Sequence, residues 1–172
     1  MIWLIGALGS LVVVVGGITA WGARLPKEHV ASRRMTLKAS PERVFEIVSS
    51  FEDAPSWRKG VKKVEIIETG EHPVFVEHGP HGKIRMRVTE RQPAKKLVTK
   101  IDDESLPFGG AWTYEIEQAE EGTRVTITER GEVKPALFRF LSKYVFTHEK
   151  TLIEYLEQLA RHLGEQPRIE PA

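Results

Sequence analysis

Histidine is the residue type whose spacing in this chain could support metal or acid–base chemistry. His78 and His81 are separated by two residues, with His72 upstream. A zinc site would need a third protein ligand, and the Gly79-Pro80 pair predicts a solvent-exposed turn instead. The chain contains no cysteine, which excludes disulfides, thiol chemistry and cysteine-based zinc sites. We therefore expect neither a metal nor a cofactor here.

His148 differs because it lies between Val145 and Leu152 on an apolar stripe with helical spacing. On that stripe it should face a sheet, where it could donate a proton or hydrogen bond to a ligand in a cavity. The alternative is a core histidine paired with a backbone carbonyl or a strand side chain. An enzyme would need His148 to converge with Glu115 or Arg130. No nucleophile elbow, phosphate-binding loop or zinc-protease motif is present, so catalytic residues stay unknown.

Polar residues on the predicted strands could orient a ligand if they face inward. These residues are Glu77, Arg85, Arg87, Glu115, Thr126 and Arg130. Arg85 and Arg87 alternate with the apolar residues of their strand, so we expect them in solvent. Which face of its strand Glu115 occupies is ambiguous, because Trp112 and Tyr114 are large enough to lie on either the buried or the solvent face.

The elements that position these residues follow from hydrophobic periodicity. A strand precedes Ser40-Pro41, which reads as a helix N-cap and first residue; that helix ends near Phe51. Glu52-Asp53-Ala54-Pro55 begins a second short helical turn or kink, because Pro55 disfavours helix at the residue before it. From Val61 onward, period-two patterns and turn signals predict about six antiparallel strands. About thirty residues without proline or glycine then predict one long helix. Its stripe comprises Leu137, Leu141, Val145, Leu152, Leu156, Leu159 and Leu163.

The first segment, Ile2 to Ala23, carries no charge and as a helix would span about 33 Å. Tryptophans lie near both of its ends, and basic residues follow it. By the positive-inside rule we predict a single-pass membrane anchor through residues 2–23, with the following domain in the cytoplasm. A cleaved signal peptide, with a cleavage site around Ala20-Trp21-Gly22, is the alternative.

The charge of the chain limits which classes of partner it can bind. The net charge is +1 and 28% of residues are charged, which gives no basic footprint for nucleic acid. The aromatic residues Phe138, Phe140, Tyr144 and Phe146 surround more than one face of the last helix. They could contact a membrane or a protein partner, unless the loop Leu106-Pro107-Phe108-Gly109-Gly110 wraps them. Arg58 and Lys59, beside Trp57, could meet lipid headgroups, although a solvated turn is the ordinary interpretation.

The run LKASPERVFEIVSSFEDAPSWRKGVKKVEI, residues 37–66, resembles the opening of the polyketide cyclase/dehydratase and lipid-transport group of the START-like (SRPBCC) superfamily. The resemblance extends over roughly residues 30 to 163 and includes the long C-terminal helix. It implies an α+β helix-grip fold, also found in the birch pollen allergen, with a curved antiparallel sheet around that helix. The predicted parts are an anchor (1–25), the helix-grip domain (26–165) and a polar tail (166–172).

Members of this superfamily include ligand carriers, aromatase/cyclases, quinone-binding proteins and regulators. The resemblance therefore implies a membrane-tethered domain that binds a small hydrophobic ligand, such as a lipid, a quinone or a polyketide-like molecule. We expect Phe45, Trp57, Trp112, Tyr114 and His148 to line its cavity, with Trp57 and Phe51 either gating the opening or anchoring the short helices. There are two alternatives. One is a cyclase or dehydratase, and the other is a non-catalytic regulator of a membrane complex with an unknown protein partner.

Overall fold

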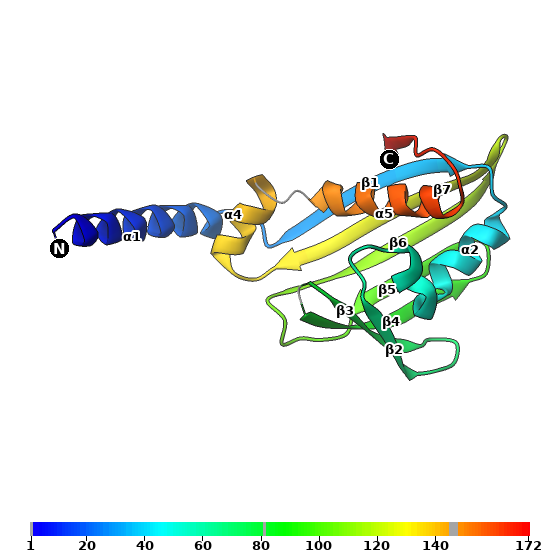
Figure 1. Ribbon diagram of the computed structural model, residues 1–172, viewed down its shortest axis with the longest axis horizontal. Coiled ribbons are helices and arrows are strands. Elements are labelled where there is room, and N and C mark those ends of the chain that lie inside the picture. The colour runs from blue at the N-terminus through cyan, green and yellow to red at the C-terminus, as the bar shows by residue number, and fades with distance from the viewer. Residues whose placement is uncertain (1, 81, 145–147) are drawn as a thin grey trace.

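The computed structural model describes the backbone of residues 2–80, 82–144 and 148–172, and the side chains of residues 13–80, 82–144 and 149–172. His81 and the side chain of His148 lie outside the described residues. The elements follow in the order α1 (Ile2–Ala23), β1 (Glu28–Leu37), α2 (Pro41–Ser49), η1 (Phe51–Asp53), α3 (Ala54–Trp57), β2 (Lys63–Glu68), β3 (Val74–Gly79), β4 (Gly82–Gln92), β5 (Lys96–Ile101), β6 (Phe108–Ala119), β7 (Gly122–Val133), α4 (Ala136–Tyr144), α5 (His148–His162) and β8 (Ile169–Pro171) (Figure 1).

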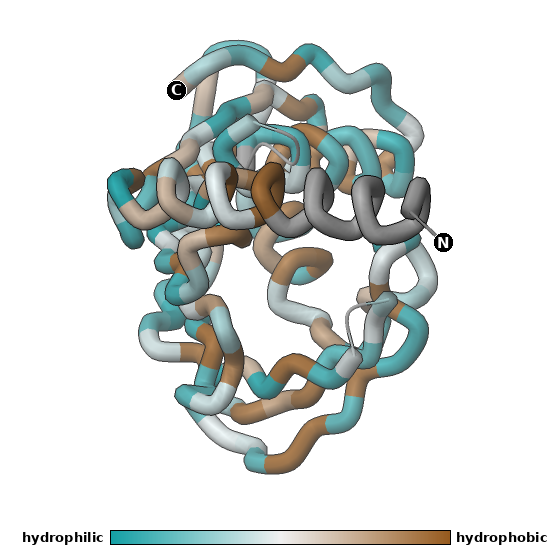
Figure 2. The backbone as a smooth tube through the Cα atoms, turned by 90° about the vertical axis from the view of Figure 1, so that its left-hand side faces the viewer, coloured by the Kyte–Doolittle hydropathy of each residue, from teal (hydrophilic) through white to brown (hydrophobic). Residues whose placement is uncertain are grey.

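An eight-stranded antiparallel sheet forms the body of the protein, in the order β2-β3-β4-β5-β6-β7-β1-β8. Register shifts between Ile66 and Glu68 in β2, and between Val88 and Glu90 in β4, are irregularities of the kind that bend a sheet. Figure 2 shows the strands curving around the interior, with apolar and hydrophilic residues alternating along them. The predicted hairpins from Val61 onward are confirmed.

Helix α5 lies across the concave side of the sheet (Figure 1). Leu152, Leu156 and Leu159 are at most 1% exposed and face strand residues such as Phe75 and Ile127 in one core. This is the part of the predicted leucine stripe that covers the sheet. Its helical spacing is what places the three leucines on one face.

Helix α2 closes one end of the sheet as the sequence predicts. The Ser40 hydroxyl accepts a hydrogen bond from the backbone nitrogen of Arg43 at 3.3 Å, which satisfies one of the free donors of the first turn. Its buried face consists of Val44, Phe45, Ile47 and Val48. The short helices η1 and α3 then turn the chain toward β2.

The C-terminal region differs from the prediction of one helix of about thirty residues. Helix α4 packs mainly beside the end of α1, beyond the part of the sheet that α5 covers, and also contacts β7 (Figure 1). The Arg139 guanidinium donates to the carbonyl oxygens of Leu25 at 2.9 Å and Ala23 at 3.5 Å. A Cβ on Gly22 would overlap the carbonyl of Ala136, so glycine permits this close approach. The apolar side of α4 therefore meets another helix, which the stripe alone did not indicate.

The predicted polar tail also contains structure, because β8 pairs with Arg33–Met35 of β1. At the other end of the chain, α1 covers the predicted membrane segment, but the side chains of residues 2–12 lie outside the described part. Among the described residues, no helix has both the length and the apolar character needed to cross a membrane.

Candidate functional site

A cavity of about 640 Å³ lies between the sheet and the helices that cover it. The sheet contributes its concave face, and α2, α3, α4 and α5 contribute the other walls. Most of the lining is apolar and includes Phe75, Met86, Ile101, Trp112, Ile127 and Leu152. Pockets of about 300–1,000 Å³ with apolar walls and a few polar groups are typical of small-molecule sites.

One polar group of the cavity is an ion pair between Arg58 and Glu77. Arg58 follows α3, and Glu77 lies on β3 two residues after the buried Phe75, on the same face of the strand. The Arg58 Nη1 and Nη2 atoms lie 2.5 and 3.2 Å from the two Glu77 carboxylate oxygens. The side chains are only 26% and 19% exposed. This is a bidentate, charge-assisted pair that holds both groups in fixed orientations.

The electrostatics of the pair follow from its burial. Burial lowers the pKa of the Arg58 guanidinium, but the charge of Glu77 and neighbouring groups outweighs burial and leaves that pKa above its ordinary value. Burial raises the pKa of Tyr114, although the positive charge of Arg58 opposes this effect. Burial likewise raises the pKa of Tyr155 well above its ordinary value. At neutral pH the cavity therefore presents a charged guanidinium and two neutral phenols.

Aromatic rings surround this pair. The Tyr155 ring of α5 lies 5.2 Å from the Trp57 ring, edge-on, and 5.5 Å from the Tyr114 ring. The Arg58 Cζ atom lies 5.3 Å from the centre of the Tyr155 ring. The indole Nε1 of Trp57 is buried and has no hydrogen-bond partner within the described part of the chain. Because a buried donor without a partner is costly, this N–H is an unsatisfied polar group in the wall of the cavity.

A second polar pair lines the cavity on β1 and β7. The His29 Nε2 atom lies 3.1 Å from a carboxylate oxygen of Glu129, and Glu129 is 8% exposed. The site therefore has polar groups on both halves of the sheet, separated by apolar wall.

The predicted lining residues fall in three places. Trp57, Trp112 and Tyr114 line the cavity. Phe45 is 7% exposed in the core and lines a smaller hollow of about 280 Å³ instead, with its ring 5.8 Å from the Arg91 Cζ atom. The side chain of His148 is outside the described residues. That any of these residues binds a ligand stays a prediction.

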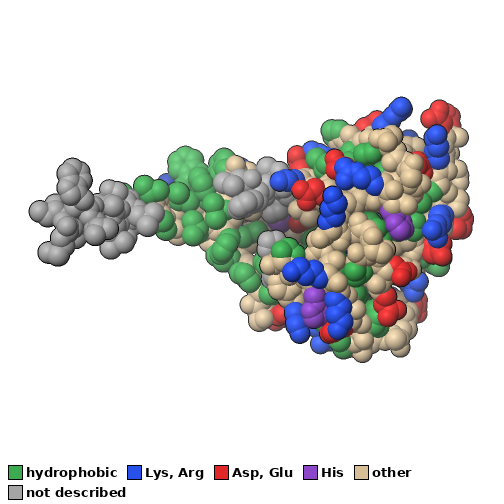
Figure 3. Space-filling model, in the orientation of Figure 1, with side chains coloured by type: hydrophobic (Ala, Val, Ile, Leu, Met, Phe, Trp, Pro, Cys, Tyr) green, Lys and Arg blue, Asp and Glu red, His purple; other side chains and the backbone are tan. Residues whose placement is uncertain are grey.

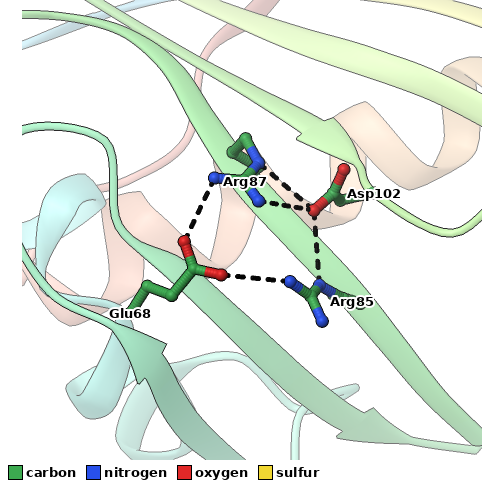
Figure 4. Close-up of polar contacts among 4 residues, drawn as sticks. All are labelled: Glu68, Arg85, Arg87 and Asp102. Carbon is green, nitrogen blue, oxygen red and sulfur yellow. Dashed lines mark hydrogen bonds and ion pairs between the residues drawn. The ribbon is translucent and has the colours of Figure 1, made fainter.

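The other strand-borne candidates mostly face away. Glu115 and Arg130 are exposed because their neighbours Tyr114 and Glu129 face inward, so the acid–base arrangement that needs them in the cavity is not formed. Arg85 and Arg87 lie on the outer face as expected. They join Glu68 and Asp102 in a network of hydrogen bonds of 3.0–3.3 Å (Figure 4).

Sequence reasoning missed the central partner of the site. Arg58 was expected in a solvated turn, but it is partly buried against Glu77. The available signal was the strand phase of Glu77, which shares a face with Phe75. Tyr155 was also missed, although it lies three residues after Leu152 and hence beside the buried stripe of its helix. Glu129 gave the same kind of signal, because it lies two residues after Ile127 on the same face of β7, and His29 shares a face of β1 with Met35 and Leu37.

Comparisons with known proteins agree with this architecture. No curated protein sequence matches the chain. The Zhui aromatase/cyclase from Streptomyces sp. R1128 is similar in structure, with a TM-score of 0.67 and 13% identity over 77% of this chain and 91% of that one. A protein from Thermus thermophilus has a TM-score of 0.60 and 21% identity over 77% and 93%. The protein Ara h 8.0201 has a TM-score of 0.57 and 13% identity over 80% and 99%.

At such identities these structures establish the fold alone, namely a curved antiparallel sheet covered by a C-terminal helix. The assignment to a family rests on the sequence instead. The model of the family described as polyketide cyclase/dehydrase and lipid transport matches residues 28–164, which include every element from β1 to α5. The chain belongs to the polyketide cyclase/dehydrase and lipid-transport family.

Proposed function

We propose that the domain binds one small hydrophobic molecule with a polar end, such as a lipid, a quinone or a polyketide-like compound, while α1 tethers it to a membrane. The observation that carries the proposal is the 640 Å³ cavity, whose apolar wall meets a polar cluster at Arg58, Glu77 and Tyr114. An apolar body would displace water from the wall. A carbonyl or hydroxyl oxygen could accept hydrogen bonds from the phenols.

The protonation states favour binding over acid–base catalysis. A phenol whose pKa is raised stays protonated at neutral pH, so it can donate a hydrogen bond but gives up its proton reluctantly. Both oxygens of the Glu77 carboxylate already accept a hydrogen bond from the Arg58 guanidinium. A cyclase or dehydratase remains the alternative function, for which the cavity would supply shape and hydrogen-bond donors.

The support for a tether is the sequence of α1. Residues 2–23 carry no charge, and Arg24 and Lys27 follow directly. An anchor of this kind would keep the cavity close to apolar cargo that is poorly soluble in water.

Native mass spectrometry of the full chain, purified in mild detergent and incubated with decylubiquinone, tests ligand binding. We expect a one-to-one adduct or a retained apolar molecule. Ile84→Trp, which fills the cavity wall, should abolish the adduct. Ile67→Trp, at a residue that is 51% exposed, should leave it unchanged. Absence of any bound apolar molecule in the unmodified chain, or equal binding by Ile84→Trp, would contradict the proposal.

A further inference from the structure

The surface shared by α1 and α4 is apolar and exposed. Val13 and Trp21 of α1 are 74% and 55% exposed, and Phe138 and Tyr144 of α4 are 54% and 52% exposed. Figure 3 shows hydrophobic side chains gathered along this part of the molecule, whereas charged side chains cover the sheet domain. Exposed apolar area of this extent indicates an interaction surface.

The charged side chains within α1 and α4, and in the residues that follow α1 as far as Lys27, are all basic. Neither residues 1–27 nor residues 133–144 contain aspartate or glutamate, yet they include Arg24, Lys27, Arg139 and Lys143. The Lys143 ammonium lies 5.6 Å from the centre of the Tyr144 ring, so its stem and that ring lie close together. Aromatic and aliphatic residues flanked by lysine and arginine are typical of helices at the surface of anionic lipid bilayers.

The position of α4 is fixed relative to the point where α1 would leave the membrane. Gly22 touches Ala136, and Arg139 binds the carbonyl oxygens of Ala23 and Leu25. These contacts join α4 to the last turn of α1 and to the residues that follow it. If α1 spans the bilayer, α4 must therefore lie at the depth of the lipid headgroups.

Helix α4 also forms part of the cavity wall. Phe138, Leu141 and Ser142 line the cavity. Since Phe138 is at the same time 54% exposed, it must lie at the rim of an opening. The opening beside α4 and the apolar surface of α1 and α4 are thus continuous.

We propose that α4 docks on the membrane surface, with Phe138 and Tyr144 inserted among the lipids and Lys143 on anionic headgroups, so that the cavity opens toward the bilayer. A hydrophobic molecule could then pass between the lipid phase and the cavity without crossing water. This inference rests on the proposed tether and adds to it the orientation of the domain and a path for its ligand.

Site-specific quenching tests the docking, since the chain has no cysteine and a single label can be introduced. Phe138→Cys and, separately, Tyr144→Cys carry a bimane label in full-length protein in nanodiscs of phosphatidylcholine and phosphatidylglycerol. The quencher is a lipid with a nitroxide near the top of its acyl chain. We expect severalfold stronger quenching at both positions than at Ile67→Cys, an exposed apolar residue on β2. Replacing Lys143 by glutamine, or omitting phosphatidylglycerol, should weaken it.

A label at Val14→Cys distinguishes failure of the docking from failure of the tether. Quenching at Val14 without quenching at Phe138 or Tyr144 would overturn the docking and leave the tether intact. Absence of quenching at all three would overturn both, whereas ligand binding is measured independently by mass spectrometry. Quenching at Phe138 that falls as the amount of protein per nanodisc rises, together with formation of a defined dimer, would also overturn the docking. That result would indicate that a second copy of the chain covers this surface.

Discussion

Two sets of charged residues in this protein have opposite surroundings, and they should respond differently to mutation. Arg58 and Glu77 are partly buried in the cavity, whereas the network of Glu68, Arg85, Arg87 and Asp102 lies on the outer face (Figure 4). Removing one partner of a buried pair leaves the other charge without compensation. Exposed pairs are screened by water and contribute little.

We expect Glu77→Gln to lower the free energy of unfolding by about 2–3 kcal/mol, because Arg58 would keep its charge and lose its carboxylate. Urea denaturation of the full chain in mild detergent, followed by circular dichroism, measures the loss. Glu68→Gln is the matched control and should cause a clearly smaller loss that disappears at high salt. Equal losses for the two variants would show that the cavity does not isolate the pair from solvent.

The phenol of Tyr114 should make stability depend on pH at the alkaline end. Below about pH 10 the phenol is protonated in both the folded and the unfolded chain, so its contribution to stability is fully present. Because burial raises its pKa in the folded state, the unfolded chain loses the proton first as pH rises. Stability should then fall by up to about 1.4 kcal/mol per pH unit until the folded pKa is passed.

The measurement is the midpoint of urea unfolding between neutral and strongly alkaline pH. Tyr114→Phe should reduce the alkaline decline without abolishing it, since it removes one buried titrating phenol and keeps the ring, whereas the pKa of Tyr155 is also raised by burial. Tyr144→Phe, at a residue that is 52% exposed, should leave the decline as it is in the unmodified chain. A decline of the same slope in all three proteins would mean that Tyr114 does not contribute.

At the scale of elements, the turn between β6 and β7 is held by a close backbone contact. Gly122 has a φ of +122°, and a Cβ at this position would overlap the carbonyl of Leu37 at the end of β1. The neighbouring Thr123 hydroxyl donates to the carbonyl of Ala39 at 2.6 Å. The turn therefore fixes the end of β1, from which α2 starts.

Gly70 provides a control for the same backbone conformation without the contact, since its φ is +120° and a Cβ there would meet no atom within 4 Å. Gly70→Ala should lower the free energy of unfolding by about 1–2 kcal/mol through backbone strain alone. Gly122→Ala should cost more, because the end of β1 must also shift. Thermal unfolding of both variants compares them, and equal losses would mean that the Leu37 contact yields without cost.

The elements that the sequence predicted well are those whose pattern is local. Ser40-Pro41 predicts the start of α2, and the spacing of Leu152, Leu156 and Leu159 predicts the buried face of α5. The separation of α4 could not be predicted, because its apolar residues fit one long stripe equally well. The contacts of Gly22 with Ala136 and of Arg139 with the carbonyls of Ala23 and Leu25 join segments more than a hundred residues apart and show that α4 packs on α1.

For the whole molecule, the cavity results from the mismatch between a bent sheet and a straight helix. Trp112 and Tyr114 could be predicted as lining residues because both are large and share a strand face with the apolar Ile116, although their size left open which face of that strand is buried. Arg58 could not, because its position depends on how η1 and α3 turn the chain toward β3. The general form of the cavity could thus be predicted from the sequence. Its polar lining could not, because it depends on contacts between segments that are distant in the chain.

The division into a core domain and an α1–α4 unit leads to a prediction for the whole chain. Among the residues whose side chains the structure describes, the buried core contains none before Ala31, so deleting residues 1–22 should leave the sheet and α5 folded. Helix α4 would lose the contact with Gly22, and the carbonyl groups that bind Arg139 would no longer be held by a helix. Amide hydrogen exchange should therefore accelerate in Ala136–Tyr144 and stay slow in α5, compared with the full chain in the same detergent. Continued protection of α4 in the shortened chain would mean that the sheet domain, through its contacts with β7, is sufficient to order this helix.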